Sequence, residues 1–447
     1  MHTLTHSWKG LHALITKVEN RWTDCLNLLK KELPEPFFYV YARSTFGLEA
    51  KQQVEEIADR VNATLVESIR NMATIQNNTK ESLLKKLAGI TTKFGYSDSL
   101  FDMTVLEGLY SQVPYLSKNS SFLELLEKVS NNSQGKMLKR FFKQAPPNPI
   151  WIVRKGLTDC DDCSRKNHLE FPMDLFQPPF FEEGLPWSLN FGGFGAIFAH
   201  ALIHDLHKEV CETPSKDQER NAKMHWRGSM EDAEAACCAL HPQNLAQPEE
   251  SGQQAWRNCR YPHHVNTCAL FDNDDVFCKN KSACFLQQYR TAMEPEFNYL
   301  SGADVQMYLD ANDTETATKV KTTYKAQFED VLKKHLDSNI ADVSGLSLAL
   351  SAYTQLLQDE CEDIETRLEG LEQFSGLALF FTTRAMSLCG ANTGQNLLWW
   401  LTTVMGHSPY HHRVNLPLQN LEAFAKAFNC SEGSAMYKQE AERCSLW

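Results

Sequence analysis

The hydrophobic positions of the N-terminal third repeat with the period of an α-helix. Between residues 51 and 72, apolar side chains recur at every third or fourth position, namely Val54, Ile57, Val61, Leu65 and Ile69. This spacing places them on one face of an amphipathic helix. The same spacing at Leu83, Leu84, Leu87 and Ile90 predicts a second helix. The N-terminal third is therefore predicted to be helical.

A proline-containing segment then interrupts the pattern. Residues 144–149 carry Pro146, Pro147 and Pro149, and the apolar run 150–153 that follows is typical of a short β-strand. We place a domain boundary within residues 130–148. Beyond it, we expect helices around residues 192–209, 338–358 and 373–388, and a C-terminal helix that includes Phe424, Ala427 and Phe428.

Composition narrows the class of protein. The chain has 447 residues, of which 43% are hydrophobic and 22% charged, as in a large soluble globular protein. Its net charge of −12 argues against a nucleic-acid partner, which a basic surface would indicate. The chain holds no long uninterrupted apolar run, and charged residues such as Lys9 and Lys17 interrupt its start, so we expect neither a membrane span nor a signal peptide in it.

Cysteines and glycosylation sequons nevertheless indicate a lineage built for the secretory pathway. The chain has 14 cysteines, and N-x-S/T sequons occur at Asn62, Asn77, Asn119, Asn131, Asn280, Asn312 and Asn429. We interpret most cysteines as disulfide partners, among them Cys211, Cys237, Cys238, Cys259, Cys268, Cys278 and Cys361. A second zinc cluster on Cys160-x-x-Cys163, or on His263 and His264, is the alternative.

The most informative motif is His200-Ala201-Leu202-Ile203-His204. Residues four apart share a helix face, so His200 and His204 can present two imidazoles to one metal ion. In the H-E-x-x-H pattern of zinc peptidases, a Glu after the first His takes the proton from the metal-bound water. Here that residue is Ala201.

Further segments resemble one family in their order. They are Leu189–Gly195, Asn339–Asp342, His407-Ser408-Pro409 with Arg413-Val414-Asn415, and the final Cys444–Trp447. Together they resemble the C-terminal part of the neprilysin and endothelin-converting-enzyme family of zinc metallopeptidases. The resemblance runs from Arg21-Trp22 to Trp447, except for a longer, cysteine-rich stretch at about residues 206–335.

The resemblance implies a fold that is mainly α with a small β-sheet, of the α+β class. Residues 141–447 would form a thermolysin-like peptidase domain that contains the insertion at 206–335. Residues 1–140 would be the remnant of the helical second domain that covers the peptide cavity in this family. Members normally carry a membrane anchor and a further helical segment before this region, so the sequence is a fragment or a shortened gene product.

The resemblance also assigns roles to individual positions. The two zinc-binding histidines match His200 and His204, the general base falls on Ala201, and the third zinc ligand falls on Ser338. Asp342 matches the aspartate that orients the first histidine. His407 and Arg413 match the residues that contact the transition-state oxyanion and the substrate carbonyl. The family's Asn-Ala pair that holds the substrate backbone falls near Asp159 and Cys160, in an altered segment. The apolar specificity pocket corresponds to Leu175, Phe180, Ile197 and Leu388.

The resemblance pairs Cys444 with Cys284 in a disulfide. The family partners of Cys25, Cys389 and Cys430 lie in the part that the sequence lacks, so these three are free, re-paired or left over.

The two replaced positions predict lost chemistry. A neutral serine replaces a charged carboxylate ligand, so zinc should bind weakly or not at all. Loss of a positioned general base costs about two to four orders of magnitude in rate. We therefore predict a catalytically inactive pseudopeptidase, of extracellular or cell-surface lineage, that binds a peptide or protein ligand. The alternatives are a metalloendopeptidase with residual activity, in which Asp337 replaces the missing ligand, and a nonfunctional truncated remnant.

Overall fold

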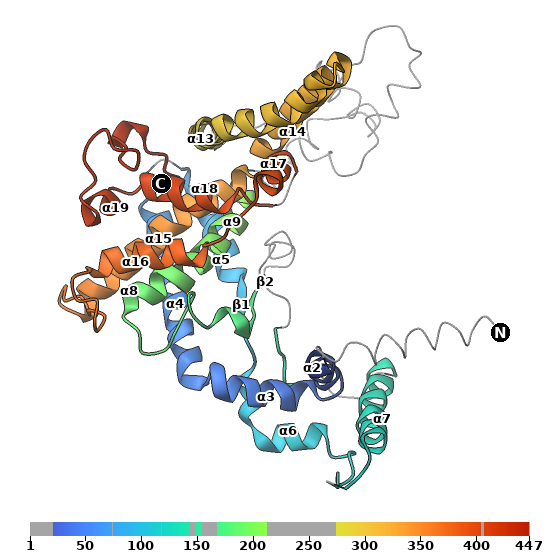
Figure 1. Ribbon diagram of the computed structural model, residues 1–447. Coiled ribbons are helices and arrows are strands. Elements are labelled where there is room, and N and C mark those ends of the chain that lie inside the picture. Colours follow the sequence, from blue (N-terminus) through green and yellow to red (C-terminus); the bar gives the residue numbers. More distant parts are fainter. Residues whose placement is uncertain are drawn as a thin grey trace, which may run out of the picture. The chain divides into compact units, whose positions relative to one another are not determined.

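The computed structural model describes residues 21–73, 75–117, 119–142, 148–153, 168–211, 274–403 and 406–446 (Figure 1). These residues fall into two compact units. Unit 1 holds the described residues of 21–56, 91–153 and 168–184, and unit 2 holds those of 57–90 and 185–446. Each unit contains segments from before and after residue 140. The division into domains of residues 1–140 and 141–447 remains a prediction.

Unit 1 is built around a small parallel sheet. Strand β1 (Thr91–Phe94) pairs with β2 (His168–Phe171), with Thr91 opposite His168 and Phe94 opposite Phe171. The surrounding elements are α2 (Arg21–Glu32), α3 (Pro34–Thr45), the start of α4 (Leu48–Asn71), η2 (Asp98–Phe101), α6 (Met103–Leu109), α7 (Phe122–Phe141) and η4 (Met173–Leu175). Buried aromatic rings form the core beside the sheet, with Phe46 stacked on Phe176 at 4.3 Å between centroids.

The predicted strand at residues 150–153 does not join this sheet. Ile152 forms an isolated antiparallel bridge with Tyr96, supported by hydrogen bonds from Ser97 N to Trp151 O and from Val153 N to Gly95 O. Pro149, immediately before the run, has no amide hydrogen with which to extend the pairing.

Unit 2 is almost entirely helical. Its elements are the rest of α4, α5 (Asn77–Gly89), α8 (Trp187–Asn190), η5 (Phe191–Gly195), α9 (Ala196–Cys211), α13 (Asp274–Asp310), α14 (Thr314–Lys334), α15 (Leu336–Glu360), α16 (Gly376–Ser387), α17 (Gly394–Thr402), α18 (Tyr410–Gln419), α19 (Glu422–Ala427) and η8 (Glu440–Glu442). Within the described residues, no helix has both the length and the apolar run that crossing a membrane requires. The predicted fold class, mainly α with a small sheet, is confirmed.

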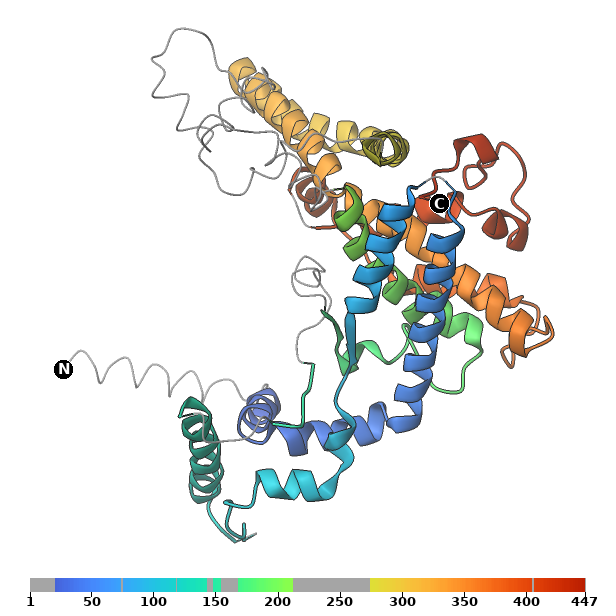
Figure 2. The ribbon, with the colours of Figure 1, turned by 180° about the vertical axis from the view of Figure 1, so that it is seen from behind.

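The centre of unit 2 is the crossing of α9 and α15, which lie side by side (Figures 1 and 2). Gly345 of α15 faces the α9 backbone so closely that a Cβ there would lie 2.6 Å from the amide nitrogen of His200. Similarly, a Cβ on Gly192 of η5 would lie 2.1 Å from the carbonyl oxygen of Phe380 in α16. Both positions require glycine because backbone, not a movable side chain, fills the space.

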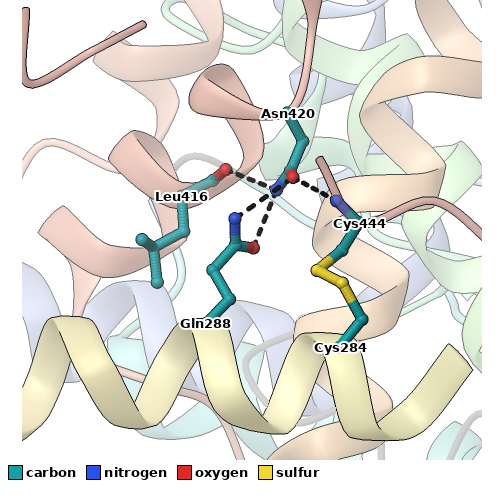
Figure 3. The surroundings of a disulfide bond; sticks show 5 residues. All are labelled: Cys284, Gln288, Leu416, Asn420 and Cys444. Atoms are coloured by element: carbon teal, nitrogen blue, oxygen red, sulfur yellow. Dashed lines mark hydrogen bonds between the residues drawn. A yellow bond between two sulfur atoms is a disulfide. The ribbon is translucent and has the colours of Figure 1, made fainter. Parts of the chain in front are cut away.

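The C-terminus of the chain is tied to α13 (Figure 3). A disulfide joins Cys284 of α13 to Cys444, the pair that the family resemblance predicts. Next to it, the amides of Gln288 and Asn420 exchange two hydrogen bonds, and the Asn420 Oδ1 also accepts one from the backbone of Cys444. These contacts attach α13, within the predicted insertion, to the C-terminal part of unit 2.

Among the described residues, free thiols are present at Cys25, Cys361, Cys389 and Cys430. For Cys25, Cys389 and Cys430 a free thiol was one of the expected states, whereas Cys361 was expected in a disulfide and this expectation is wrong. Most of the remaining cysteines, with Cys160, Cys163, His263 and His264, lie outside the described residues.

Candidate functional site

Helix α9 carries both histidines of the predicted motif on one face. His200 and His204 are buried, with exposed fractions of 7% and 4%, and their ring centroids lie 5.9 Å apart. Ala201 is also buried and offers no group that accepts a proton. The π-helix η5 leads directly into α9, and such π-bulges are frequent at functional sites.

Asp342 of α15 is the centre of a buried charge cluster next to His200. Its Oδ1 lies 3.0 Å from the Nδ1 of His200. Arg384 of α16 donates to Oδ1 at 2.9 Å, and Arg413 of α18 donates from Nε to Oδ2 at 2.7 Å and from Nη2 to Oδ1 at 2.9 Å. Asp342 itself is 1% exposed, so three helices direct side chains at one desolvated carboxylate.

The cluster fixes the charge of each member. Burial by itself would raise the pKa of Asp342, but Arg413 and His200 outweigh it, and the pKa lies well below its ordinary value. Burial lowers the pKa of His200, and Asp342 offsets only part of that effect. At neutral pH, the site therefore holds an ionised Asp342 and a neutral His200.

His407 completes this face of unit 2. Its ring centroid lies 5.5 Å from that of His200. Burial, with contributions from the charges of Arg413 and His200, lowers the pKa of His407 from 6.5 to about 2. The backbone carbonyl of His407 accepts a hydrogen bond from the Trp400 indole at 2.8 Å, and Ser408 donates to Asn339 Oδ1 at 2.7 Å.

Ser338 also helps to hold this loop. Its hydroxyl donates to the carbonyl oxygen of Gly406 at 2.7 Å. The serine proton is thus bonded to the backbone just before His407. Ser338 therefore acts here as a structural hydrogen-bond donor.

The residues present do not fit a three-ligand catalytic zinc centre. Nε2 of His200 has no hydrogen-bond partner among the described residues, which suits a metal ligand. However, within the described residues, His200 and His204 do not share a group of three His, Cys, Asp or Glu ligand atoms close enough to hold one metal ion. Two imidazoles and a hydroxyl committed to Gly406 lack the negative charge and the third ligand that such sites provide.

Asp337, the proposed substitute ligand, lies in a different contact. Its Oδ1 is 3.1 Å from Nδ1 of His207, one turn of α9 beyond His204. It follows that the carboxylate next to Ser338 in the sequence is already engaged by a third histidine.

The predicted specificity-pocket residues are divided between the two units. Leu175 and Phe180 belong to unit 1, Ile197 and Leu388 belong to unit 2, and all four side chains are half-buried. Asp159, predicted to hold the substrate backbone, lies outside the described residues.

Two members of the Asp342 cluster were not predicted from the sequence. Arg384 is 3% exposed within an otherwise apolar stretch of α16, and a charged residue at a core position was the available signal. Tyr289 of α13 is fully buried, and the nearby Asp342 charge together with burial raises its pKa well above the ordinary value. Nothing in the local sequence marks Tyr289 as a neighbour of Asp342.

An H-x-x-x-H helix packed on a second helix, whose aspartate orients the first histidine, is the framework of a zinc-peptidase site. The sequence comparison agrees: the pattern described as "Peptidase family M13" matches residues 163–243 and 258–444, and its N-terminal counterpart matches residues 6–97. The chain belongs to peptidase family M13. The predicted resemblance to neprilysin-type peptidases is thus confirmed.

Individual relatives are distant but matched along nearly the whole chain. Mouse "Membrane metallo-endopeptidase-like 1" is 24% identical over 435 residues, which are 97% of this chain and 46% of that protein. "Neprilysin-2" of Caenorhabditis elegans is 25% identical over 451 residues, covering 100% of this chain and 49% of that protein. The chain spans about half the length of the curated relatives it matches.

Solved structures show the same fold. The open state of the Mycobacterium tuberculosis zinc metalloprotease Zmp1 aligns with a TM-score of 0.55 and 17% identity, covering 97% of this chain and 53% of that one. A "Haemonchus galactose containing glycoprotein complex" aligns with a TM-score of 0.53 and 19% identity, covering 98% of this chain and 57% of that one.

Proposed function

We propose that this chain is a catalytically inactive member of peptidase family M13 that binds peptides without cleaving them. The observation that carries the proposal is the state of the two replaced positions. Buried Ala201 cannot accept a proton, and the Ser338 hydroxyl is bonded to Gly406. The contact of Asp337 with His207 argues against its service as a replacement ligand.

The orienting part of the site supports a retained binding role. Asp342 still contacts His200 and Arg413, and half-buried His407 lies beside His200 as a neutral imidazole. His407 and Arg413 match family residues that contact substrate, so part of the group that holds a peptide is retained while the group that activates water is not. Zinc at His200 and His204 is expected to bind weakly or not at all.

A peptide-retention experiment tests this function. The full chain is equilibrated with a mixed pool of short peptides, with added Zn²⁺ or with chelator, and mass spectrometry reads both retained and cleaved peptides. We expect retention without cleavage under both conditions. Cleavage that the chelator abolishes, or the absence of any retained peptide, would contradict the proposal.

A pair of variants locates the binding face. Leu388 matches a specificity-pocket position and is half-buried, whereas Ile364 is 69% exposed and matches none. Leu388→Asp should reduce peptide retention by about fivefold or more, the effect of losing an apolar contact worth roughly 1 kcal/mol. Ile364→Asp, the matched control, should leave retention unchanged. Equal effects of the two variants would argue against binding at this face.

We further propose that the protein passes through the secretory pathway. The Cys284–Cys444 disulfide supports this compartment, and Asn312 and Asn429 are exposed acceptors with positive φ of 59° and 50° in tight turns. Asn62 differs because its side-chain oxygen is buried. Mass spectrometry of the protein from its own cells should find glycans on Asn312 and Asn429 but not on Asn62. Unmodified asparagine at both exposed sites would refute this assignment.

A further inference from the structure

Two helices of unit 2 hold a second group of metal-ligand side chains, which does not include His200 or His204. The group consists of Glu296 on α13 with His411 and His412 in the first turn of α18. Within the described residues, it is the one group of three or more His, Cys, Asp or Glu residues whose ligand atoms all lie within 4.8 Å of one another.

The contacts between α13 and α18 explain why these side chains meet. The Gln288 Nε2 donates to Asn420 Oδ1 at 3.1 Å, and the Asn420 Nδ2 donates to Gln288 Oε1 at 2.8 Å (Figure 3). These two hydrogen bonds hold the C-terminal end of α18 against α13 at Gln288. Glu296 follows Gln288 by eight residues, and His412 precedes Asn420 by eight. Eight residues advance a helix by about 12 Å and stay on one broad face, so antiparallel helices bring Glu296 opposite His412.

The two distances from Glu296 to the histidines are slightly shorter than those between ligands of a tetrahedral metal site. The Glu296 Oε2 lies 3.2 Å from Nε2 of His411 and 3.1 Å from Nε2 of His412. Ligands bonded to Zn²⁺ at 2.0–2.2 Å stand about 3.3–3.6 Å apart at tetrahedral angles, so small side-chain adjustments accommodate an ion. Side-chain exposures of 45% for His411, 29% for Glu296 and 9% for His412 leave one side of the group open to solvent.

We propose that Glu296, His411 and His412 bind a divalent transition-metal ion, with Zn²⁺ as the best match and solvent as the fourth ligand. Two imidazoles and one carboxylate are a common zinc ligand set, whereas Ca²⁺ and Mg²⁺ prefer oxygen ligands. The site is distinct from the peptidase motif, because neither His200 nor His204 belongs to the group. The proposal does not depend on the proposed peptide-binding function.

Calorimetric titration of the full chain with Zn²⁺ tests the site. Metal is first removed with chelator and free thiols are alkylated, because thiols such as Cys361 also bind zinc. Glu296→Gln and His411→Ala should each lower the affinity for one equivalent of Zn²⁺ by about 10- to 100-fold or more. Changes to residues that only orient metal ligands already cost this much, so loss of a ligand itself should cost at least as much. Co²⁺ bound in the same place should give a tetrahedral nitrogen–oxygen spectrum that both variants lose.

Two control variants separate this site from other histidines. The double variant His200→Ala/His204→Ala and the single variant His168→Ala, at an exposed histidine of unit 1, should leave this Zn²⁺ equivalent unchanged. Glu296→Gln retains the shape of the side chain and His411 is exposed, so the variants should fold, as their thermal unfolding will show. Three results would overturn the proposal: unchanged zinc affinity in both site variants, loss of zinc binding only in the His200→Ala/His204→Ala variant, or no zinc binding by the natural chain. The group would then be a hydrogen-bonded cluster only.

Discussion

Asp342 is an ionised carboxylate that lies almost completely out of contact with solvent. Its carboxylate is 1% exposed and is stabilised by Arg384, Arg413 and His200. An ion this deeply desolvated is stable only while its partners neutralise it, and the partners depend on it in turn. The retained machinery of the site is therefore also a structural element of unit 2.

This dependence predicts a large effect of neutralising Asp342. Asp342→Asn leaves two buried guanidinium groups without their counter-ion and should lower the free energy of unfolding by about 3–5 kcal/mol. The matched control is Asp330→Asn, whose exposed partner Lys334 lies one helical turn away. That change should cost about 0.5 kcal/mol or less. Chemical denaturation measures both, and equal effects would contradict the account of the cluster.

His407 predicts how stability depends on pH. Its pKa falls from 6.5 to about 2 on folding, so below pH 6.5 the unfolded chain binds a proton that the folded chain rejects. The contribution of His407 is complete above pH 6.5 and declines as the pH falls towards 2. Between pH 7 and pH 5, wild type should lose about 1–2 kcal/mol more than His407→Gln. Parallel stability curves for the two proteins would contradict a neutral imidazole at His407.

The packing of helix α9 against helix α15 determines where the site residues lie. Gly345→Ala would place a methyl group 2.6 Å from the His200 amide nitrogen, so the helices must separate. We expect a loss of about 1–3 kcal/mol in the free energy of unfolding, as for other overpacked cores. The control is Gly302→Ala, at an exposed position of α13 where an added Cβ would have nothing within 4 Å. This change should raise the free energy of unfolding by about 0.5–1 kcal/mol. Thermal denaturation distinguishes these opposite signs.

The disulfide makes a second prediction at this scale. Cys284 and Cys444 close a loop across 160 residues, and removing such a link typically costs about 2–5 kcal/mol. Cys444→Ser should therefore destabilise unit 2, whereas Cys430→Ser, which removes a free thiol, should change little. Denaturant unfolding under non-reducing conditions compares the two, and a stable Cys444→Ser protein would contradict a structural role for the bond.

Periodicity predicted the long helices well because their apolar positions repeat locally. Val54, Ile57, Val61 and Leu65 are fully buried in α4, as their spacing predicts. The run at 150–153 was less predictable, since pairing depends on a partner segment more than 50 residues away, at Tyr96. The same limit applies to the site. The spacing of His200 and His204 is visible in the sequence, but the contacts of Asp342 with Arg384 and of Ser338 with Gly406 arise from folding.

The proposed function separates the M13 fold of this chain from the catalytic chemistry of the family. The chain matches the family through both units and spans about half the length of its relatives, so catalysis cannot be transferred from them by similarity alone. The local geometry is more informative. It retains the residues that orient a histidine and lacks the two carboxylates that would bind the metal and activate water.

The most direct test of this claim restores those two carboxylates. Cleavage of a mixed peptide pool, read by mass spectrometry with Zn²⁺ or chelator, compares the natural chain with Ala201→Glu/Ser338→Glu and the uncharged control Ala201→Gln/Ser338→Gln. We predict that the glutamate variant alone cuts peptides, that it requires zinc, and that its rate exceeds the control by about two orders of magnitude or more. Zinc-dependent cleavage by the natural chain, or silence from a correctly folded glutamate variant, would contradict an inactive site on an intact peptidase framework.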